Sequence, residues 1–418
     1  MKAQKVVLDN HIRLLMEPLN EVPSVCIGLW VCTGSRDETP EENGLTHFIE
    51  HMLFKGTANR DALEIAKEID KIGGVLNAFT GREYTCFYTK VLKTHVEKGF
   101  EILSDIFFNS LFREEDIERE RGVILQEIKM VQDTPDEYVH ELFYRDLWGG
   151  NPLGAPISGT VETVSRFTRE DILDYFQGHY LSSRLILSVA GNLDRDEVIK
   201  LGERYFGSGS LNGARSPQLK PAQTLSGFHP HTRELEQLHV CWGGKGCART
   251  DQQRYPLYAL STYLGGGMSS RLFQEVREKR GLVYSIYSYA NFFRHEGIFA
   301  ITWSAHKSRF DEIVGIVTGE IERIRSEGLT DRDLSEIKEQ MKGNLLLSLE
   351  GTNSRMNKLA TDEIYFGRFV PIDEVVARVD AMTLDDIGSV LETYILPEKF
   401  CMTTLGPPVD TEGPPGQL

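Results

Sequence analysis

The apolar and polar positions of the first half of the chain change period repeatedly, from the alternation of strands to the spacing of helices. This order of strand and helix blocks predicts an α+β domain, in which helices are layered on a largely antiparallel sheet. The expected strands cover 5–8, 12–16, 24–32, 75–80, 84–91 and 185–190. The expected helices cover the segment around 47–51 and the segments 62–72, 95–109 and 114–132.

The pattern of the first half returns in the second half, which predicts two homologous domains. The segment TREDI at Thr168 recurs as TLDDI at Thr383, and both pair a threonine N-cap with acidic residues in the first helical turn. At the same offset, the apolar run around Val25 matches the run around Val240. The acidic helix start at 115–117 has a counterpart near 332–334, with a small shift in offset. Each half therefore carries the same order of elements.

A stretch rich in glycine and proline separates the two halves and predicts a linker. We expect a catalytic zinc-binding domain at 1–206, a linker at 207–231, a homologous domain without metal ligands at 232–405 and a flexible tail at 406–418. Two domains of about two hundred residues fit the usual domain size.

Composition narrows the class of protein. With 40% hydrophobic and 26% charged residues, and no apolar run long enough to cross a bilayer, the chain is typical of soluble globular proteins. The start at 1–10 lacks the apolar core of a secretory signal, so we expect a cytoplasmic, bacterial protein with no membrane partner. The six cysteines form no CxxC pair, so we expect them to be free thiols.

The net charge of −16 argues against a nucleic-acid-binding surface, which needs basic clusters. Negative charge lining a cavity would attract basic peptides, but charge alone favours a solvated acidic surface.

The motif His47-Phe48-Ile49-Glu50-His51 is the strongest chemical signal in the sequence. On a helix, His47 and His51 lie on one face and offer two imidazoles to one cation. Glu50 lies beside the metal without having to ligate it, as a general base acting on a metal-bound water must. The alternative is an amphipathic helix with two partly exposed histidines, so a third ligand must be found.

The candidate third ligand lies in the expected helix 114–132. Glu120 and Glu127 are two turns apart and share one face, and Glu127 lies among apolar residues, where a carboxylate is costly without a partner. A metal would supply that partner, and Glu120 would support a ligand by a hydrogen bond. Spacing alone leaves a surface salt bridge for Glu127 equally open.

Three segments in order resemble the pitrilysin/insulinase-type zinc metallopeptidases, in particular the short-subunit branch that includes the mitochondrial processing peptidase beta subunit. They are GLTHFIEHMLFKGT at 44–57, LNAFTGREYTCFY at 76–88 and ERERGVILQEIKM at 118–130. The resemblance covers nearly the whole chain. It implies a zinc endopeptidase that acts on peptides or unfolded segments.

The resemblance also implies roles for particular residues. His47, His51 and Glu127 would bind one Zn²⁺ per chain, Glu50 would be the general base and Glu120 would support a ligand. On the expected strand 75–80, Asn77 and Ala78 would bind substrate, which agrees with the pairing of an extended peptide to a sheet edge.

The second half of the sequence also resembles this family, although it contains no metal-binding motif. The run GGGMSSRLFQEVREKRGLVYSIYS at 265–288 resembles the family's C-terminal substrate-contacting region, and Arg277 and Tyr284 have the spacing of its Arg/Tyr pair. Such donors suit a developing oxyanion. The second half has no HxxEH, and Asn344 falls near the position equivalent to Glu127.

The family's short subunits pair into a clam-shell around a chamber. The resemblance therefore implies a homodimer, or a heterodimer with a non-catalytic homologue, in which Arg277 and Tyr284 act on the partner's zinc site. The alternative function is a non-catalytic structural or assembly subunit of a peptidase-like complex.

Overall fold

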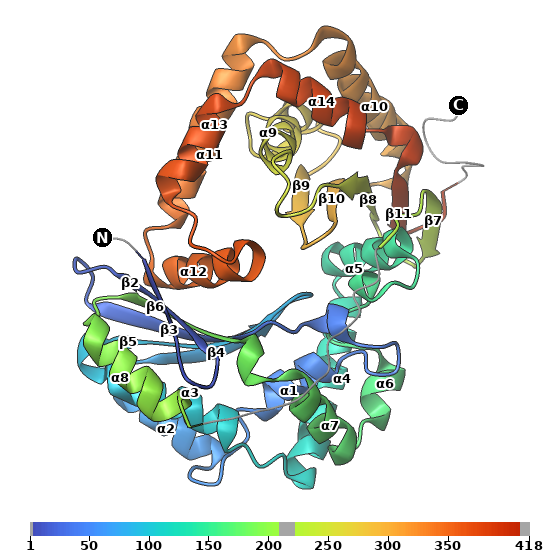
Figure 1. The fold of residues 1–418 in the computed structure, drawn as a ribbon. Helices are drawn as coiled ribbons and strands as arrows, with labels where there is room; N and C mark the ends of the chain where they lie inside the picture. Colours follow the sequence, from blue (N-terminus) through green and yellow to red (C-terminus); the bar gives the residue numbers. More distant parts are fainter. Residues whose placement is uncertain (1–2, 209–221, 410–418) are drawn as a thin grey trace. The chain divides into compact units, whose positions relative to one another are not determined.

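The computed structural model describes residues 3–208 and 222–409, and the chain divides into two compact units (Figure 1). The first unit comprises Met1–Met130, Ala155–Leu219 and Leu347–Phe369, and the second comprises the rest of the chain. Each unit consists of one mixed sheet with helices, which confirms the α+β prediction. Most of the expected linker and tail, 209–221 and 410–418, lies outside the described residues.

The first unit is built on a six-stranded sheet with the order β1-β2-β6-β3-β5-β4. Only the described pair β2 and β6 is parallel, and the other neighbours are antiparallel. The strands are β1 (Gln4–Val7), β2 (Arg13–Pro18), β3 (Ser24–Val31), β4 (Val75–Thr80), β5 (Thr85–Leu92) and β6 (Leu185–Gly191). Each expected strand of the first half is therefore present, with ends that differ by at most two residues from the prediction.

Helices cover both faces of this sheet, which explains why β3 is apolar along its whole length. Ile27 and Leu29 point into the core beneath α3, whereas Cys26 and Trp30 point to the opposite face beneath α12. The helices of the unit are α1 (Leu45–Met52), α2 (Ala62–Lys71), α3 (Val96–Phe108), α4 (Glu114–Gln132), α6 (Val161–Arg166), α7 (Arg169–His179), α8 (Arg195–Phe206) and α12 (Thr352–Phe366).

The second unit repeats this plan with one strand fewer, in the order β7-β11-β8-β10-β9. Its only parallel pair among the described strands, β7 and β11, corresponds to β2 and β6. The strands are β7 (Gly227–Thr232), β8 (Leu238–Gly246), β9 (Ile286–Phe292), β10 (Gly297–Ala305) and β11 (Cys401–Gly406). The helices are α5 (Pro135–Trp148), α9 (Arg254–Gly265), α10 (Phe310–Glu327), α11 (Asp331–Ser348), α13 (Ile372–Ala381) and α14 (Leu384–Tyr394). The predicted duplication is thus visible as a shared strand order.

The two halves of the chain each give one helix to the other unit. Helix α5 comes from the first half and packs on β8 and β11, where Asp146 accepts hydrogen bonds from Thr403 Oγ1 at 2.8 Å and contacts His231 Nε2 at 2.8 Å. Helix α12 comes from the second half and packs on β2, β3 and β6. There, Trp30 Nε1 contacts Met356 Sδ at 3.2 Å, and Ser188 Oγ donates to the Met356 carbonyl at 2.7 Å.

This exchange of helices departs from the contiguous domains expected at 1–206 and 232–405. The division into compact units places Val131–Gly154 in the second unit and Leu347–Phe369 in the first. The physical reason is that each sheet has two apolar faces, and the exchanged helix covers the face that the unit's other helices leave open.

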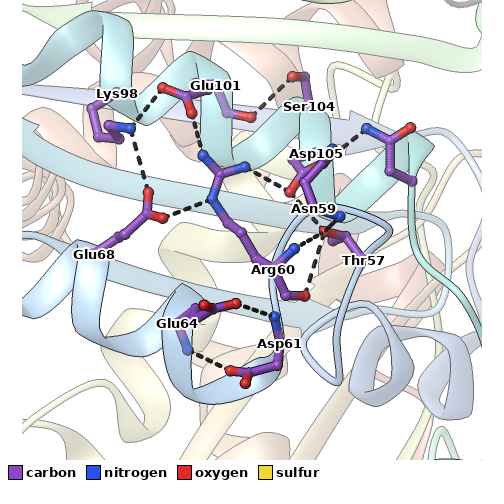
Figure 2. A network of polar contacts seen from close by, with 11 residues as sticks. Thr57, Asn59, Arg60, Asp61, Glu64, Glu68, Lys98, Glu101, Ser104 and Asp105 are labelled. Atoms are coloured by element: carbon purple, nitrogen blue, oxygen red, sulfur yellow. Dashed lines mark hydrogen bonds and ion pairs between the residues drawn. The ribbon is translucent and has the colours of Figure 1, made fainter.

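A polar network connects the loop after α1 to α3 (Figure 2). The guanidinium of Arg60 lies among three carboxylates, with Nη1 at 2.8 Å from Asp105 Oδ2, Nε at 3.0 Å from Glu68 Oε1, and Nη2 in contact with Glu101. Thr57 Oγ1 donates to Asp105 at 2.8 Å. Because α1 ends just before this loop, the network holds the C-terminal side of α1 in place.

All six cysteines lie in the described residues as free thiols, and five of them are buried. Burial raises the pKa of the Cys26, Cys241 and Cys401 thiols to about 12, so these thiols are inert at neutral pH. Among the described helices, none has the length and apolar character required to span a bilayer.

Candidate active site

The HFIEH motif lies on α1, and α4 supplies the remaining candidate ligand. His47 and His51 are one turn apart, so their rings lie side by side with centroids 4.7 Å apart. Glu127 Oε2 lies 3.6 Å from His47 Nε2 and 3.5 Å from His51 Nε2. The structure therefore brings together the three residues expected to bind zinc.

These three side chains have the chemistry and spacing of a catalytic zinc site. One ligand atom from each lies within 4.8 Å of the other two. Two ligands at usual zinc distances in a tetrahedral site are about 3.4 Å apart, close to the separations of Glu127 from the two imidazoles. Two imidazoles and one carboxylate leave a fourth position for water or substrate, so the donor set fits Zn²⁺.

The protonation states of His47 and Glu127 also suit a metal. Burial, with a smaller effect of His51, lowers the pKa of His47 to about 4, so its imidazole is neutral at pH 7. The contact with His51 lowers the pKa of Glu127, so its carboxylate is ionised. A neutral imidazole and an ionised carboxylate are the forms that coordinate a cation.

Glu120 orients the imidazole of His51, and Lys55 in turn holds Glu120. Glu120 Oε2 lies 3.1 Å from His51 Nδ1, and the side chain of Glu120 is only 3% exposed. Its other oxygen, Oε1, lies 2.7 Å from Lys55 Nζ. When His51 Nδ1 donates to Glu120, Nε2 is the nitrogen left to face Glu127. Glu120 thus lies beside His51, as its proposed supporting role requires, and the contact with Lys55 was not expected from the sequence.

Glu50 points from α1 toward the edge strand β4. Thr80 Oγ1, at the end of β4, donates a hydrogen bond to Glu50 Oε2. Burial raises the pKa of Glu50, and the Thr80 hydrogen bond partly opposes this shift. A carboxylate with a raised pKa, next to the candidate metal ligands but not among them, is suited to accept and return a proton.

Asn77 and Ala78 lie in the middle of β4. This strand pairs with β5 through Asn77–Tyr88 and Ala78–Phe87, and it forms an outer edge of the sheet in the described residues. An edge strand presents free backbone groups to which an extended peptide can bind. Leu76 and Ala78 contact the core next to α1, so by the alternation of a strand Thr80 lies on that same face.

Arg277 and Tyr284 lie close together in the second unit. The Cζ atom of Arg277 is 5.1 Å from the centre of the Tyr284 ring, and Tyr284 is 81% exposed. Arg277 lies in a short π-helix at Phe273–Glu278. Asn344 is the fourteenth residue of α11, as Glu127 is the fourteenth residue of α4, which supports the equivalence of the two positions.

Sequence reasoning missed three residues that contact this site or its helix: Glu38, Lys55 and Thr80. A signal existed for Thr80, because a residue two positions after Ala78 on a strand lies on the same face. The contacts of Glu38 and Lys55 depend on how loops pack against α1 and α4, and the spacing of residues gives no information on this.

Comparisons with protein families cover most of the chain. A model described as Insulinase (Peptidase family M16) matches residues 13–161. A second model, described as Peptidase M16 inactive domain, matches residues 166–341. The first match contains His47, His51 and Glu127, the three candidate zinc ligands, and the second match contains Arg277 and Tyr284.

Bacterial relatives align along nearly the full chain. The chain is 39% identical to YmxG of Bacillus subtilis, named an uncharacterized zinc protease, over 97% of this chain and 98% of that protein. It is also 39% identical to an uncharacterized zinc protease of Streptomyces coelicolor, over 98% of this chain and 91% of that protein. A solved structure of a protease from Helicobacter pylori shares the fold, with a TM-score of 0.90 and 22% identity over 97% of this chain and 100% of that one.

Proposed function

Because the chain belongs to the M16 (insulinase) family of zinc metallopeptidases, we propose that it is an endopeptidase that hydrolyses peptides or unfolded segments. The observation that carries this proposal is the convergence of His47, His51 and Glu127, with Glu50 beside them and held by Thr80. One zinc ion per chain would be held by these three ligands.

Each group has a distinct task in the reaction. Zinc, when bound, supplies a Lewis acid that polarises the scissile carbonyl and makes water acidic enough to act as the nucleophile. Glu50 takes a proton from that water and returns it to the leaving amine. Glu120 keeps the imidazole of His51 in the orientation that zinc requires.

The substrate would bind as an additional strand along β4. Backbone hydrogen bonds to Asn77 and Ala78 would hold the peptide extended beside α1, where Glu50 meets the end of β4. The net charge of −16 would favour basic peptides by electrostatic steering.

Zinc content and peptide cleavage test this proposal together. The purified chain should bind one zinc and cleave a quenched peptide. Glu50→Gln should retain zinc and lose about 10²–10⁴-fold in kcat. Glu127→Gln should lose zinc, whereas Glu115→Gln, an exposed carboxylate on the same helix, should keep both zinc and activity. A wild-type chain with neither zinc nor cleavage would instead fit the non-catalytic assembly subunit.

We further propose that the chain works as a dimer in which Arg277 and Tyr284 stabilise the oxyanion at the partner's zinc site. Supporting this, Tyr284 is 81% exposed and free to meet another surface. Mixing Glu50→Gln chains with Tyr284→Phe chains tests the idea. Activity should recover partly in the mixture if the groups act in trans, and mass measurement under native conditions should show whether the pair is a homodimer.

A further inference from the structure

The helix that carries HFIEH begins at a residue unable to cap it. Gly44 occupies the N-cap of α1 with φ of +102°, and a Cβ atom there would approach the Gly159 Cα to 2.8 Å. Both the left-handed backbone and this close approach require glycine. Glycine has no side-chain acceptor for the free N–H groups of a first helical turn. A helix of only eight residues therefore starts without a cap of its own.

Glu38 supplies the missing acceptor from the preceding loop. Its Oε1 accepts from the Thr46 N–H at 2.8 Å, and its Oε2 accepts from the Gly44 N–H at 2.9 Å. The side chain of Asn43 donates to the same oxygen at 3.2 Å. Glu38 is 3% exposed, so its carboxylate lies inside the protein at the positive end of the helix dipole.

From this geometry we propose that Glu38 is a positioning residue for the peptidase reaction, because its buried carboxylate fixes the start of α1. The inference rests on the proposed function. Thr46, which Glu38 holds, directly precedes the ligand His47. A small rotation of so short a helix would move His47, Glu50 and His51 together, away from Glu127 and Thr80. Misplacement of about 1 Å can cost a reaction about 10²-fold.

Glu38 serves this alignment at a cost to the fold. Burial raises the pKa of its carboxyl from 4.5 to about 7, although the hydrogen bonds from Gly44 and Thr46 oppose the shift. Two neighbouring groups, Tyr175 on α7 and Asp37, add no positive charge that would oppose the raised pKa of Glu38. The Tyr175 hydroxyl forms a hydrogen bond with Thr46 Oγ1 at 3.0 Å. The buried charge thus lowers the stability of the fold. Replacing Glu38 by glutamine removes that charge, but the amide leaves one oxygen to accept hydrogen bonds in place of two.

This conflict between alignment and stability gives a test that a purely structural role would not pass. The Glu38→Gln variant should unfold at a temperature close to that of the wild type, because removal of the buried charge offsets the lost hydrogen bond. Its zinc dissociation constant should nevertheless rise about tenfold or more, and kcat should fall about tenfold with KM nearly unchanged. In the metal-free chain, the Thr46 amide should exchange its hydrogen faster than in the wild type.

Two further variants keep the test decisive. The Glu38→Asp variant retains the charge and should retain more zinc affinity than Glu38→Gln. As a control, Glu41→Gln replaces an exposed carboxylate in the same loop and should match the wild type. The inference is overturned if Glu38→Gln also matches the wild type in zinc affinity and amide exchange. It is overturned as well if Glu38→Gln only lowers the unfolding temperature and regains full affinity on cooling. If the wild type cleaves no peptide, the proposed function fails, and zinc affinity and amide exchange still decide the role of Glu38.

Discussion

The Nζ atom of Lys55 lies 2.7 Å from Oε1 of Glu120, and the other oxygen of that carboxylate contacts His51. Glu120 is nearly buried, whereas Lys55 is 30% exposed in its side chain. A buried carboxylate needs a positive partner or several donors to remain in place. Lys55 therefore holds Glu120 where it contacts the imidazole of His51.

Replacing Lys55 should lower the affinity of the site for zinc, although Lys55 is not itself a proposed ligand. We expect Lys55→Met to raise the zinc dissociation constant about tenfold, the lower end of the effect of supporting residues around metals. Competition with a chromophoric chelator measures this constant. Lys55→Arg should retain most of the affinity, and Lys67→Met, on the exposed face of α2, should have no effect. An unchanged constant in Lys55→Met would show that Glu120 needs no cation.

Thr80 offers a test of how Glu50 is held. Thr80→Val keeps the shape of the side chain but removes the hydroxyl that donates to Glu50 Oε2. A hydrogen bond to a charged group contributes about 1.5–3 kcal/mol, so kcat should fall about tenfold or more. Zinc content and KM should remain close to wild type, because neither ligand nor substrate contacts are removed. Steady-state kinetics should also show that Thr80→Ser restores most of the rate.

Most of the elements around the site are visible in the sequence because local patterns determine them. The strand at Val75–Thr80 and the helix at Glu114–Gln132 begin and end at the residues that the sequence predicted. His47 and His51 could be proposed together because helical periodicity places them on one face, and Glu127 became a candidate because it lies among apolar residues on a second helix. The resemblance to known peptidases then selected Glu127 over an equally plausible salt bridge.

The remaining features depend on contacts between distant segments, which no local pattern records. Helices α5 and α12 have ordinary amphipathic sequences, and nothing in them tells which of two similar sheets they cover. The sequence pattern does not distinguish Glu38 from the other acidic residues of its loop, yet its side chain lies buried at the start of α1. Such placements follow from packing, so they required the structure.

Arg60 should contribute strongly to stability because its guanidinium, 12% exposed in the side chain, lies among three carboxylates. Removing one partner of a buried ion pair leaves uncompensated charge and costs about 3–5 kcal/mol. Since this network is partly open to solvent, we expect Arg60→Met to lower the free energy of unfolding by about 3 kcal/mol. Denaturant titration measures this loss. Lys98→Met, at 36% exposure in the same network, should cost less than about 1 kcal/mol, and equal losses would contradict the ranking.

The pH dependence of stability should reveal the buried proton site at Glu38. The pKa of its carboxyl is about 7 in the folded chain, against 4.5 for the unperturbed group, and burial is the main cause. Between these values the folded state binds the proton and the unfolded state does not, so the proton stabilises the fold. This stabilisation is complete below the unfolded pKa and is lost as pH rises through the folded pKa.

Comparing wild type with Glu38→Gln isolates this effect. As pH rises from about 4.5 to about 7, the free energy of unfolding of the wild type should fall relative to that of the variant, and the difference should level off above about pH 8. Asp37, whose pKa burial raises to about 6, shifts stability in the same direction but is present in both proteins. Denaturant titrations at a series of pH values measure the difference. If the free energies of unfolding of the two proteins change in parallel across this pH window, Glu38 stays ionised in the folded chain. The prediction that burial raises its pKa would then be contradicted.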